Sequence, residues 1–255
     1  MIKTQWDYTK LAETYALRPE YAPAAIDAMV SIAEVCTGDQ VCDIGAGVGH
    51  LTIPLLEREF RVIAVEPNDA MRQRGIERTR PFEKVQWYEA TGESTQQEDS
   101  SFDLVTFGSS FNVCDRSKAL RESARLLKPR RWFACMWNHR NLNDPIQAGI
   151  EAIIERALGK YDYGTRREDQ TEVINQSNLF GPVVRLEADV VHRQGVDECI
   201  AAWRSHGTLQ RQAGTKFDQV IDAIEDYLRS NSNSSILVPF TTRIWMAQLK
   251  PQGEI

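Results

Sequence analysis

Short apolar runs and amphipathic stretches alternate along the first 140 residues of the chain. The runs have the length of buried strands, whereas the stretches between them repeat their apolar residues at helical spacing. Asn68 is the expected N-cap of one such helix. Strands are predicted at 41–44, 61–66, 85–90, 102–107 and 132–138, and helices at 21–35, 51–59, 69–78 and 115–127. This order is typical of a doubly wound α/β sheet.

The remainder of the chain is less regular. A helix is predicted at 145–158, a polar and turn-rich stretch at 160–173, and a strand at 183–191. Apolar residues from Val196 to Trp203 and from Phe217 to Leu228 predict two more helices, and a strand is predicted at 240–250. We therefore expect one domain over residues 1–255, with a core at 1–138, a helical cap at 140–230 around the strand at 183–191, and a closing strand at 240–250.

Composition narrows the class of protein. The chain has 255 residues, with 30 Lys and Arg against 36 Asp and Glu, and a formal net charge of −6. Such a chain is a poor candidate for nucleic-acid binding, which needs a concentrated excess of cations. It has no apolar run of about 20 residues that could span a membrane, and MIKTQWDYTK at the start lacks the apolar core of a signal peptide. We expect a cytoplasmic protein with neither a nucleic-acid nor a membrane partner.

Cysteine and histidine spacing argues against a metal site. The five cysteines include no Cys-x-x-Cys pair, and the four histidines are scattered along the chain. Zinc sites in sequence usually show closely spaced ligand pairs. We therefore expect reduced thiols and no metal.

The strongest chemical motif is Asp43-Ile44-Gly45-Ala46-Gly47-Val48-Gly49, between a strand and a helix. Glycine lets the chain turn sharply and lets a ligand touch the backbone, and a helix start offers unpaired N–H groups. A dinucleotide fingerprint would need glycine at position 50, where the sequence has His50. The motif therefore disfavours a nicotinamide-dependent oxidoreductase, and the leading acid suits a ligand with an ammonium group.

Glu66 ends the second predicted strand. A carboxylate at that position can accept hydrogen bonds from both hydroxyls of a ribose. A lone glutamate there would by default be an exposed strand end, but its combination with the glycine loop favours a nucleoside site.

Taken together, these segments resemble the class I S-adenosylmethionine-dependent methyltransferases, in a branch that acts on small molecules. The resemblance covers roughly residues 6–138 and, more weakly, the closing strands. It rests on YALRPEY, VCDIGAGVGHLT, VIAVEPNDAM, EATGEST, SSFDLVTFGSSFNVCD and RLLKPRRWFACMWN. The family implies a Rossmann-like sheet, mostly parallel with one antiparallel strand, and a helical cap inserted near the C-terminal strands.

The resemblance implies S-adenosyl-L-methionine as cofactor. Asp43 would lie near its amino group and Glu66 would hold its ribose, while Met71 would border the adenine, although a methionine on an amphipathic helix is more often part of the core. The implied cofactor residues are Asp43, Gly45, Ala46, Gly47, Gly49, Glu66, Pro67, Asn68, Met71, Thr91, Gly92, Glu93, Ser109 and Ser110. Ser109 and Ser110 would lie under the sulfonium.

The chain departs from the family before the fifth strand. The family usually has Lys-Pro-Gly-Gly there, but Pro129 is followed by Arg130 and Arg131. We expect this turn to differ in geometry. Because it lies away from the implied cofactor pocket, we interpret the difference as structural.

Methyl transfer from a sulfonium needs mainly alignment, and it needs a base only if the acceptor must lose a proton. Position 112, where this branch often has histidine, is Asn112, and an amide can orient a substrate but cannot take its proton. Candidate groups elsewhere are His139, His206, Tyr8 and Tyr15. Each of these could instead be a structural residue.

Several arginines fall in segments predicted to lie over the strand ends. They are Arg18, Arg140, Arg166, Arg167 and Arg204. Because arginine binds carboxylate and phosphate through two parallel hydrogen bonds, we hypothesise a small anionic substrate held by Arg18, Tyr21, Arg140 and Arg204. The alternative for each arginine is a solvated surface position.

The sequence thus predicts methyl transfer to an oxygen or nitrogen atom of a small molecule. A methyltransferase-like binding protein without activity is the main alternative, and the intact Asp43, glycines and Glu66 argue against it. Methylation of RNA is disfavoured because no basic stripe with interleaved aromatic residues is present.

Overall fold

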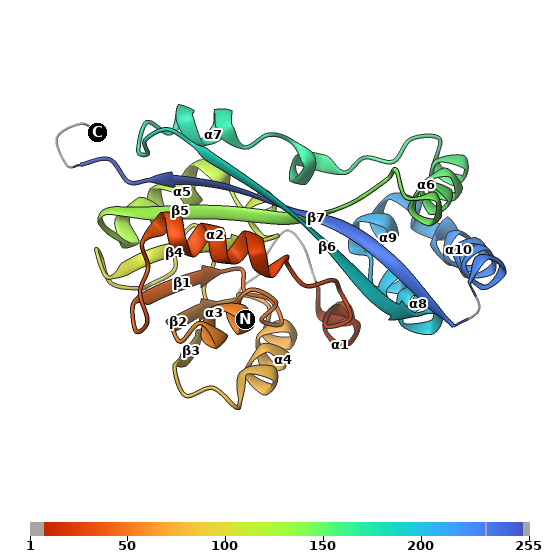
Figure 1. Ribbon diagram of the computed structural model, residues 1–255, viewed down its shortest axis with the longest axis horizontal. Coiled ribbons are helices and arrows are strands. Elements are labelled where there is room, and N and C mark those ends of the chain that lie inside the picture. The colour runs from red at the N-terminus through yellow and green to blue at the C-terminus, as the bar shows by residue number, and fades with distance from the viewer. Residues whose placement is uncertain (1–7, 233, 252–255) are drawn as a thin grey trace.

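A single twisted sheet organises the molecule (Figure 1). The computed structural model describes residues 8–232 and 234–251. The seven strands lie in the order β3-β2-β1-β4-β5-β7-β6, and β7 runs antiparallel to both of its neighbours. Their bounds are Gln40–Ile44 (β1), Arg61–Val65 (β2), Val85–Tyr88 (β3), Phe102–Gly108 (β4), Leu127–Arg140 (β5), Val184–Gly195 (β6) and Ser235–Gln248 (β7). The doubly wound α/β fold with one antiparallel strand is confirmed.

Helices cover both faces of this sheet. Alternating strand residues explain why: Val41 and Leu104 pack with α2 and α3 on one face, whereas Cys42 and Val105 pack with α5 and α7 on the other. The helices are Ala12–Tyr15 (α1), Pro23–Ala33 (α2), Thr52–Glu57 (α3), Asp69–Thr79 (α4), Arg116–Leu126 (α5), Pro145–Leu158 (α6), Thr171–Gln176 (α7), Val196–Arg204 (α8), Gly207–Ala213 (α9) and Phe217–Asn231 (α10). None of the described helices is long and apolar enough to cross a bilayer.

Side-chain caps fix where several helices begin. Asn68 accepts a hydrogen bond from the Met71 N–H, so the predicted N-cap of α4 is confirmed. Asp115 caps α5 and Asp144 caps α6 in the same way. These short polar side chains satisfy N–H groups that a helix start leaves unpaired.

A second packed unit lies beyond the end of the parallel strands. Helices α6, α8, α9 and α10 gather around the outer part of the β6–β7 ribbon (Figure 1). Ile154, Trp203, Leu209 and Ile221 are buried in this cluster together with Phe240 of β7. We call these four helices the cap.

The structure adds elements that the apolar pattern did not predict. Helix α9 was missed because Leu209 and Ala213 are its only buried apolar side chains. The stretch at 160–173 contains a 3₁₀ turn at Gly164–Arg167 and the start of α7. Strand β5 begins at Leu127 and β7 at Ser235, each five residues earlier than expected.

The turn that departs from the family lies within β5. Arg130 has a φ of +61°, in the left-handed region that glycine occupies at least cost. The arginine therefore adopts a backbone conformation suited to glycine, at the price of strain.

The start of the family resemblance, residues 6 and 7, and most of MIKTQWDYTK lie outside the described residues.

Candidate active site

A large cavity opens at the carboxyl ends of β1, β2 and β4, between the sheet and the cap. Its volume is about 1220 Å³, above the roughly 300–1,000 Å³ of an ordinary small-molecule pocket. The cofactor residues implied by the family line it, except Gly49. Within the described residues no cluster of three or more His, Cys, Asp and Glu side chains could hold a metal ion.

The glycine loop follows β1 and bends sharply against the sheet. Gly45, Gly47 and Gly49 have φ angles of +66°, +58° and +88°. A Cβ on Gly45 would lie 2.4 Å from the Cβ of Ser110. Ser110 is itself held because its hydroxyl donates to the Ile44 carbonyl at 2.5 Å. Only glycine therefore fits at position 45, whereas a Cβ on Gly47 would meet only the Met71 Cε, at 3.8 Å.

Asp43 lies at the base of this loop. Its carboxylate is fully buried and accepts hydrogen bonds from the hydroxyls of Thr52, at 2.6 Å, and Thr106, at 3.1 Å. Burial raises the pKa of Asp43 to about 6, against the opposing effect of these hydrogen bonds. At neutral pH the group is an anion with fixed orientation beside the cavity.

Glu66 follows β2 and faces the same loop. Its Oε2 accepts the Gly47 N–H at 2.9 Å, and its Oε1 accepts the Asn68 N–H at 2.8 Å. The Arg72 guanidinium donates to the Glu66 carbonyl oxygen at 2.8 Å. Burial raises the pKa of Glu66 to about 7. Each carboxylate oxygen retains a second lone pair for a ligand in the cavity.

The residues implied for the adenine lie around one end of the cavity. Asn68 caps α4 and also donates to the Thr9 hydroxyl at 3.1 Å. Met71 is buried against Ala12 and Val48 and also lines the cavity. Pro67, Thr91, Gly92 and Glu93 complete this wall.

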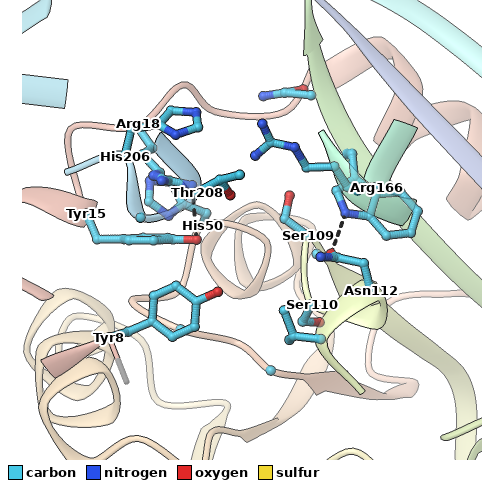
Figure 2. A pocket seen from close by; sticks show the side chains of 18 of the residues that line it. Tyr8, Tyr15, Arg18, His50, Ser109, Ser110, Asn112, Arg166, His206 and Thr208 are labelled. Carbon is cyan, nitrogen blue, oxygen red and sulfur yellow. Dashed lines mark hydrogen bonds between the residues drawn. The ribbon is translucent and has the colours of Figure 1, made fainter. Parts of the chain in front are cut away.

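The loop after β4 forms the centre of the cavity (Figure 2). The Ser109 and Tyr21 hydroxyls are 2.8 Å apart, and Ser109 has a φ of +60°. Asn112 accepts a hydrogen bond from the Trp137 indole N–H at 2.9 Å. These contacts fix the Asn112 oxygen and leave its amide group as a donor toward the cavity.

Tyr8 and Tyr15 face this loop from the opposite side of the cavity (Figure 2). Their ring centroids are 6.1 Å apart, and Tyr15 lies edge-on to His50 at 6.0 Å. Burial, followed by the charges of Arg78 and Arg18, lowers the pKa of His50 to about 3. His50 was considered in the sequence only as a missing glycine, and no local pattern showed that it faces the cavity.

His139 and His206 differ in how many of their ring nitrogens already have a hydrogen-bond partner. His139 has both ring nitrogens engaged, Nδ1 with the Arg243 guanidinium at 3.2 Å and Nε2 with the Arg166 carbonyl oxygen at 3.1 Å. It is therefore no free base, and the expectation that it could take a proton is corrected. His206 stacks on Trp203 and accepts the Leu209 N–H through Nδ1 at 3.3 Å, so Nε2 is the nitrogen left for a ligand.

The arginines also separate into two groups. Arg204 is half-exposed and pairs with Glu225 at 3.0 Å on the outer side of α8, so the structure does not bring it to the cavity and its predicted substrate contact is corrected. Arg140 lines the cavity but pairs with Glu151 at 2.7 Å and lies over the Trp203 ring. The cavity is also lined by Arg18, Tyr21, Arg166 and Arg167.

Comparisons with known proteins agree with this geometry. Residues 42–135 match the model of the methyltransferase domain family. An uncharacterized methyltransferase of Mycobacterium tuberculosis is 34% identical over 124 residues, which are 49% of this chain and 48% of that protein. The chain spans about half the length of the curated relatives it matches.

Solved structures share the fold. A methyltransferase structure from Anaeromyxobacter dehalogenans covers 92% of this chain and 99% of its own, with a TM-score of 0.60 and 18% identity. A phosphoethanolamine N-methyltransferase of Haemonchus contortus, solved with S-adenosyl-L-methionine, covers 98% of this chain and 59% of its own, with a TM-score of 0.55 and 16% identity. Residues 42–135 therefore match a methyltransferase domain, and the fold over most of the chain is the one that these solved structures share.

Proposed function

We propose that this protein transfers a methyl group from S-adenosyl-L-methionine to an oxygen or nitrogen atom of a small molecule. The observation that carries the proposal is the Glu66 carboxylate, fixed by the Gly47 and Asn68 N–H groups at the edge of the cavity. The family match and the neighbour solved with this cofactor support the same assignment. We further expect a cytoplasmic protein whose partner is a small molecule and not a nucleic acid.

The residues fit the cofactor chemically. Glu66 supplies a charged acceptor for two ribose hydroxyls, and Asp43 supplies an anion for an ammonium group. Because a Cβ on Gly47 would meet only one atom within 4 Å, the loop backbone borders open space at this point. A ligand can therefore approach the peptide groups of the loop closely.

When bound, S-adenosylmethionine supplies an activated methyl group and a leaving group that needs no proton. The task of the protein is then to align the acceptor atom and to exclude water. Ser109 and Asn112 are placed to orient the acceptor, because each is held by a second residue, Tyr21 or Trp137. The cap helices α8 and α9 cover this part of the cavity.

An acceptor that loses a proton needs a base, and few groups here are available. His206 accepts the Leu209 N–H through Nδ1, so its neutral ring carries the proton on Nε2 and donates there. Burial and nearby arginines hold the pKa of His206 well below the ordinary value. Tyr8 and Tyr15 face the cavity, and burial raises the pKa of Tyr8, so Tyr8 is a donor at neutral pH. We assign Tyr15 as the candidate for handling the proton, with His206 as a hydrogen-bond donor to the substrate and Asn112 as an orienting amide.

Isothermal titration calorimetry tests this function. We expect S-adenosylmethionine to bind with a dissociation constant of about 1 mM or lower, and NADH to bind much more weakly. Tighter binding of NADH would contradict the proposal and favour an oxidoreductase. Binding of the cofactor without methyl transfer to any small acceptor would favour a binding protein instead.

A further inference from the structure

The half of the cavity lined by Arg18, Arg140, Arg166 and Arg167 carries an excess of positive charge. Three of its arginines, Arg18, Arg166 and Arg167, form no ion pair with a carboxylate among the residues that the structure describes. The nearby carboxylates are otherwise engaged. Glu151 is bound by Arg140 and by the Tyr163 hydroxyl, and the exposed Asp162 accepts the Gly164 N–H at 2.7 Å.

Arg166 is held in place through its backbone. It ends the 3₁₀ turn with Arg167, and the buried Gln170 amide donates to the Thr165 and Glu168 carbonyl oxygens, each at 2.8 Å. His139 donates from Nε2 to the Arg166 carbonyl oxygen at 3.1 Å. The position of His139 thus supports this turn.

The Arg166 side chain reaches into the cavity from the side opposite Tyr8 and Tyr15 (Figure 2). The Tyr163 ring lies beside it, with the guanidinium carbon 5.1 Å from the ring centroid. From the other side, Arg18 stacks on the Tyr15 ring at 4.2 Å. Among the described residues, its guanidinium donates to two neutral oxygens, those of the Tyr15 hydroxyl and the Ser205 carbonyl. Both guanidinium groups therefore keep unused donors.

A cation removed from water without a counter-charge is unfavourable, so buried charges in proteins are usually paired. The pKa values of Arg166 and His206 reflect this excess of positive charge. Burial, together with the charges of Arg18 and Arg140, lowers the pKa of Arg166. Burial and then the charges of Arg166, Arg18 and Arg140 hold the pKa of His206 far below its ordinary value. An anion in this space would relieve both effects.

We propose that this half of the cavity is an anion-binding subsite in which Arg166 and Arg18 hold a carboxylate or phosphate group of the methyl acceptor. The inference rests on the proposed function, because it assumes that the Glu66 half holds the cofactor. It names the substrate class: a small molecule with an anionic group at one end and its acceptor atom near Ser109 and Asn112.

Calorimetry on the full chain saturated with S-adenosylhomocysteine tests this subsite. Succinate and inorganic phosphate serve as separate probes, so that carboxylate and phosphate recognition are distinguished. We expect at least one probe to bind, and Arg166→Gln to weaken its binding at least about tenfold, because charge-assisted hydrogen bonds are lost. Arg166→Lys, which keeps the charge without the planar fork, should give an intermediate loss.

Arg204→Gln is the matched control, because it removes a guanidinium from the cap outside the cavity. It should leave the binding of both probes unchanged. Equal weakening by Arg204→Gln and Arg166→Gln, or no binding of either probe to the wild type, would overturn the subsite. Unchanged binding of S-adenosylhomocysteine to Arg166→Gln shows that the variant is folded. Failure of the wild type to bind S-adenosylhomocysteine would instead contradict the proposed function.

Discussion

Replacing Glu66 by glutamine removes one charge from the candidate cofactor site and keeps the shape of the side chain. The carboxylate accepts the Gly47 and Asn68 N–H groups through different oxygens. A glutamine has one acceptor oxygen, so its amide group must oppose one of these two donors. The oxygen that remains is neutral and is shared between the backbone and the ribose.

The loss can be estimated from this geometry. A hydrogen bond to a charged group contributes about 1.5–3 kcal/mol, and Glu66→Gln removes at least one such bond to the ribose. The dissociation constant of S-adenosylhomocysteine should therefore rise about 10- to 150-fold.

The pH dependence provides a second test. Because the pKa of Glu66 is raised to about 7, the carboxyl group gains a proton as the pH falls through 7 in the unliganded protein. Binding that requires the anion should weaken about tenfold from pH 8 to pH 6 in the wild type. Glu66→Gln should lose this dependence and keep only the step below about pH 6 that comes from Asp43.

The unliganded protein should show the opposite trend in stability. A raised pKa means that the folded state binds the proton more tightly than the unfolded state. The contribution of Glu66 to the free energy of unfolding is therefore fully present below about pH 4.5. It is lost as the pH rises through about 7, and it amounts to about 3 kcal/mol.

Calorimetry with S-adenosylhomocysteine, on the wild type and Glu66→Gln at each pH, measures these effects. Glu77→Gln, which removes an exposed carboxylate from α4, is the control. An unchanged dissociation constant in Glu66→Gln, or an equal pH dependence in both proteins, would refute the assignment of Glu66 to the ribose.

Three further predictions concern stability, each measured by urea unfolding. Gly45→Ala should lower the free energy of unfolding by about 1–3 kcal/mol more than Gly38→Ala does, because only the first Cβ meets other atoms; equal losses would contradict the close contact. Arg130→Gly should raise it by about 1 kcal/mol, since φ is positive there; a decrease would argue against strain in this turn. Arg140→Met should lower it by about 3 kcal/mol or more, because the largely buried Glu151 loses its guanidinium partner, and a smaller change would show that this pair is solvated.

The sheet could be predicted from the sequence because each strand and helix start is encoded by residues that are close together in the chain. The apolar runs of β1, β2 and β4 and the N-cap at Asn68 each lie within a few residues. The glycine loop and Glu66 follow directly from these strands, so their convergence at one edge of the sheet could be predicted as well.

The acceptor half of the cavity could not be predicted in the same way. Arg204 and His206 are two residues apart at the end of α8, yet one faces solvent and the other the cavity. Arg166 reaches the cavity because Gln170 and His139 anchor its turn. His139 and Arg166 are 27 residues apart, and a contact over that separation leaves no periodic trace in the sequence. A single arginine likewise carries no mark of the side it will face.

The register of the β6–β7 ribbon bears on how this protein could acquire a new acceptor. Gly195 and Ser235 are direct partners across the ribbon, and α8, α9 and α10 all lie between them in the sequence. The excursion thus departs from and rejoins the sheet at neighbouring points. Segments with adjacent ends can be lengthened, shortened or exchanged without disturbing the scaffold that carries them. Recombination at these two positions offers a route to new specificities in which the machinery around Glu66 is inherited intact.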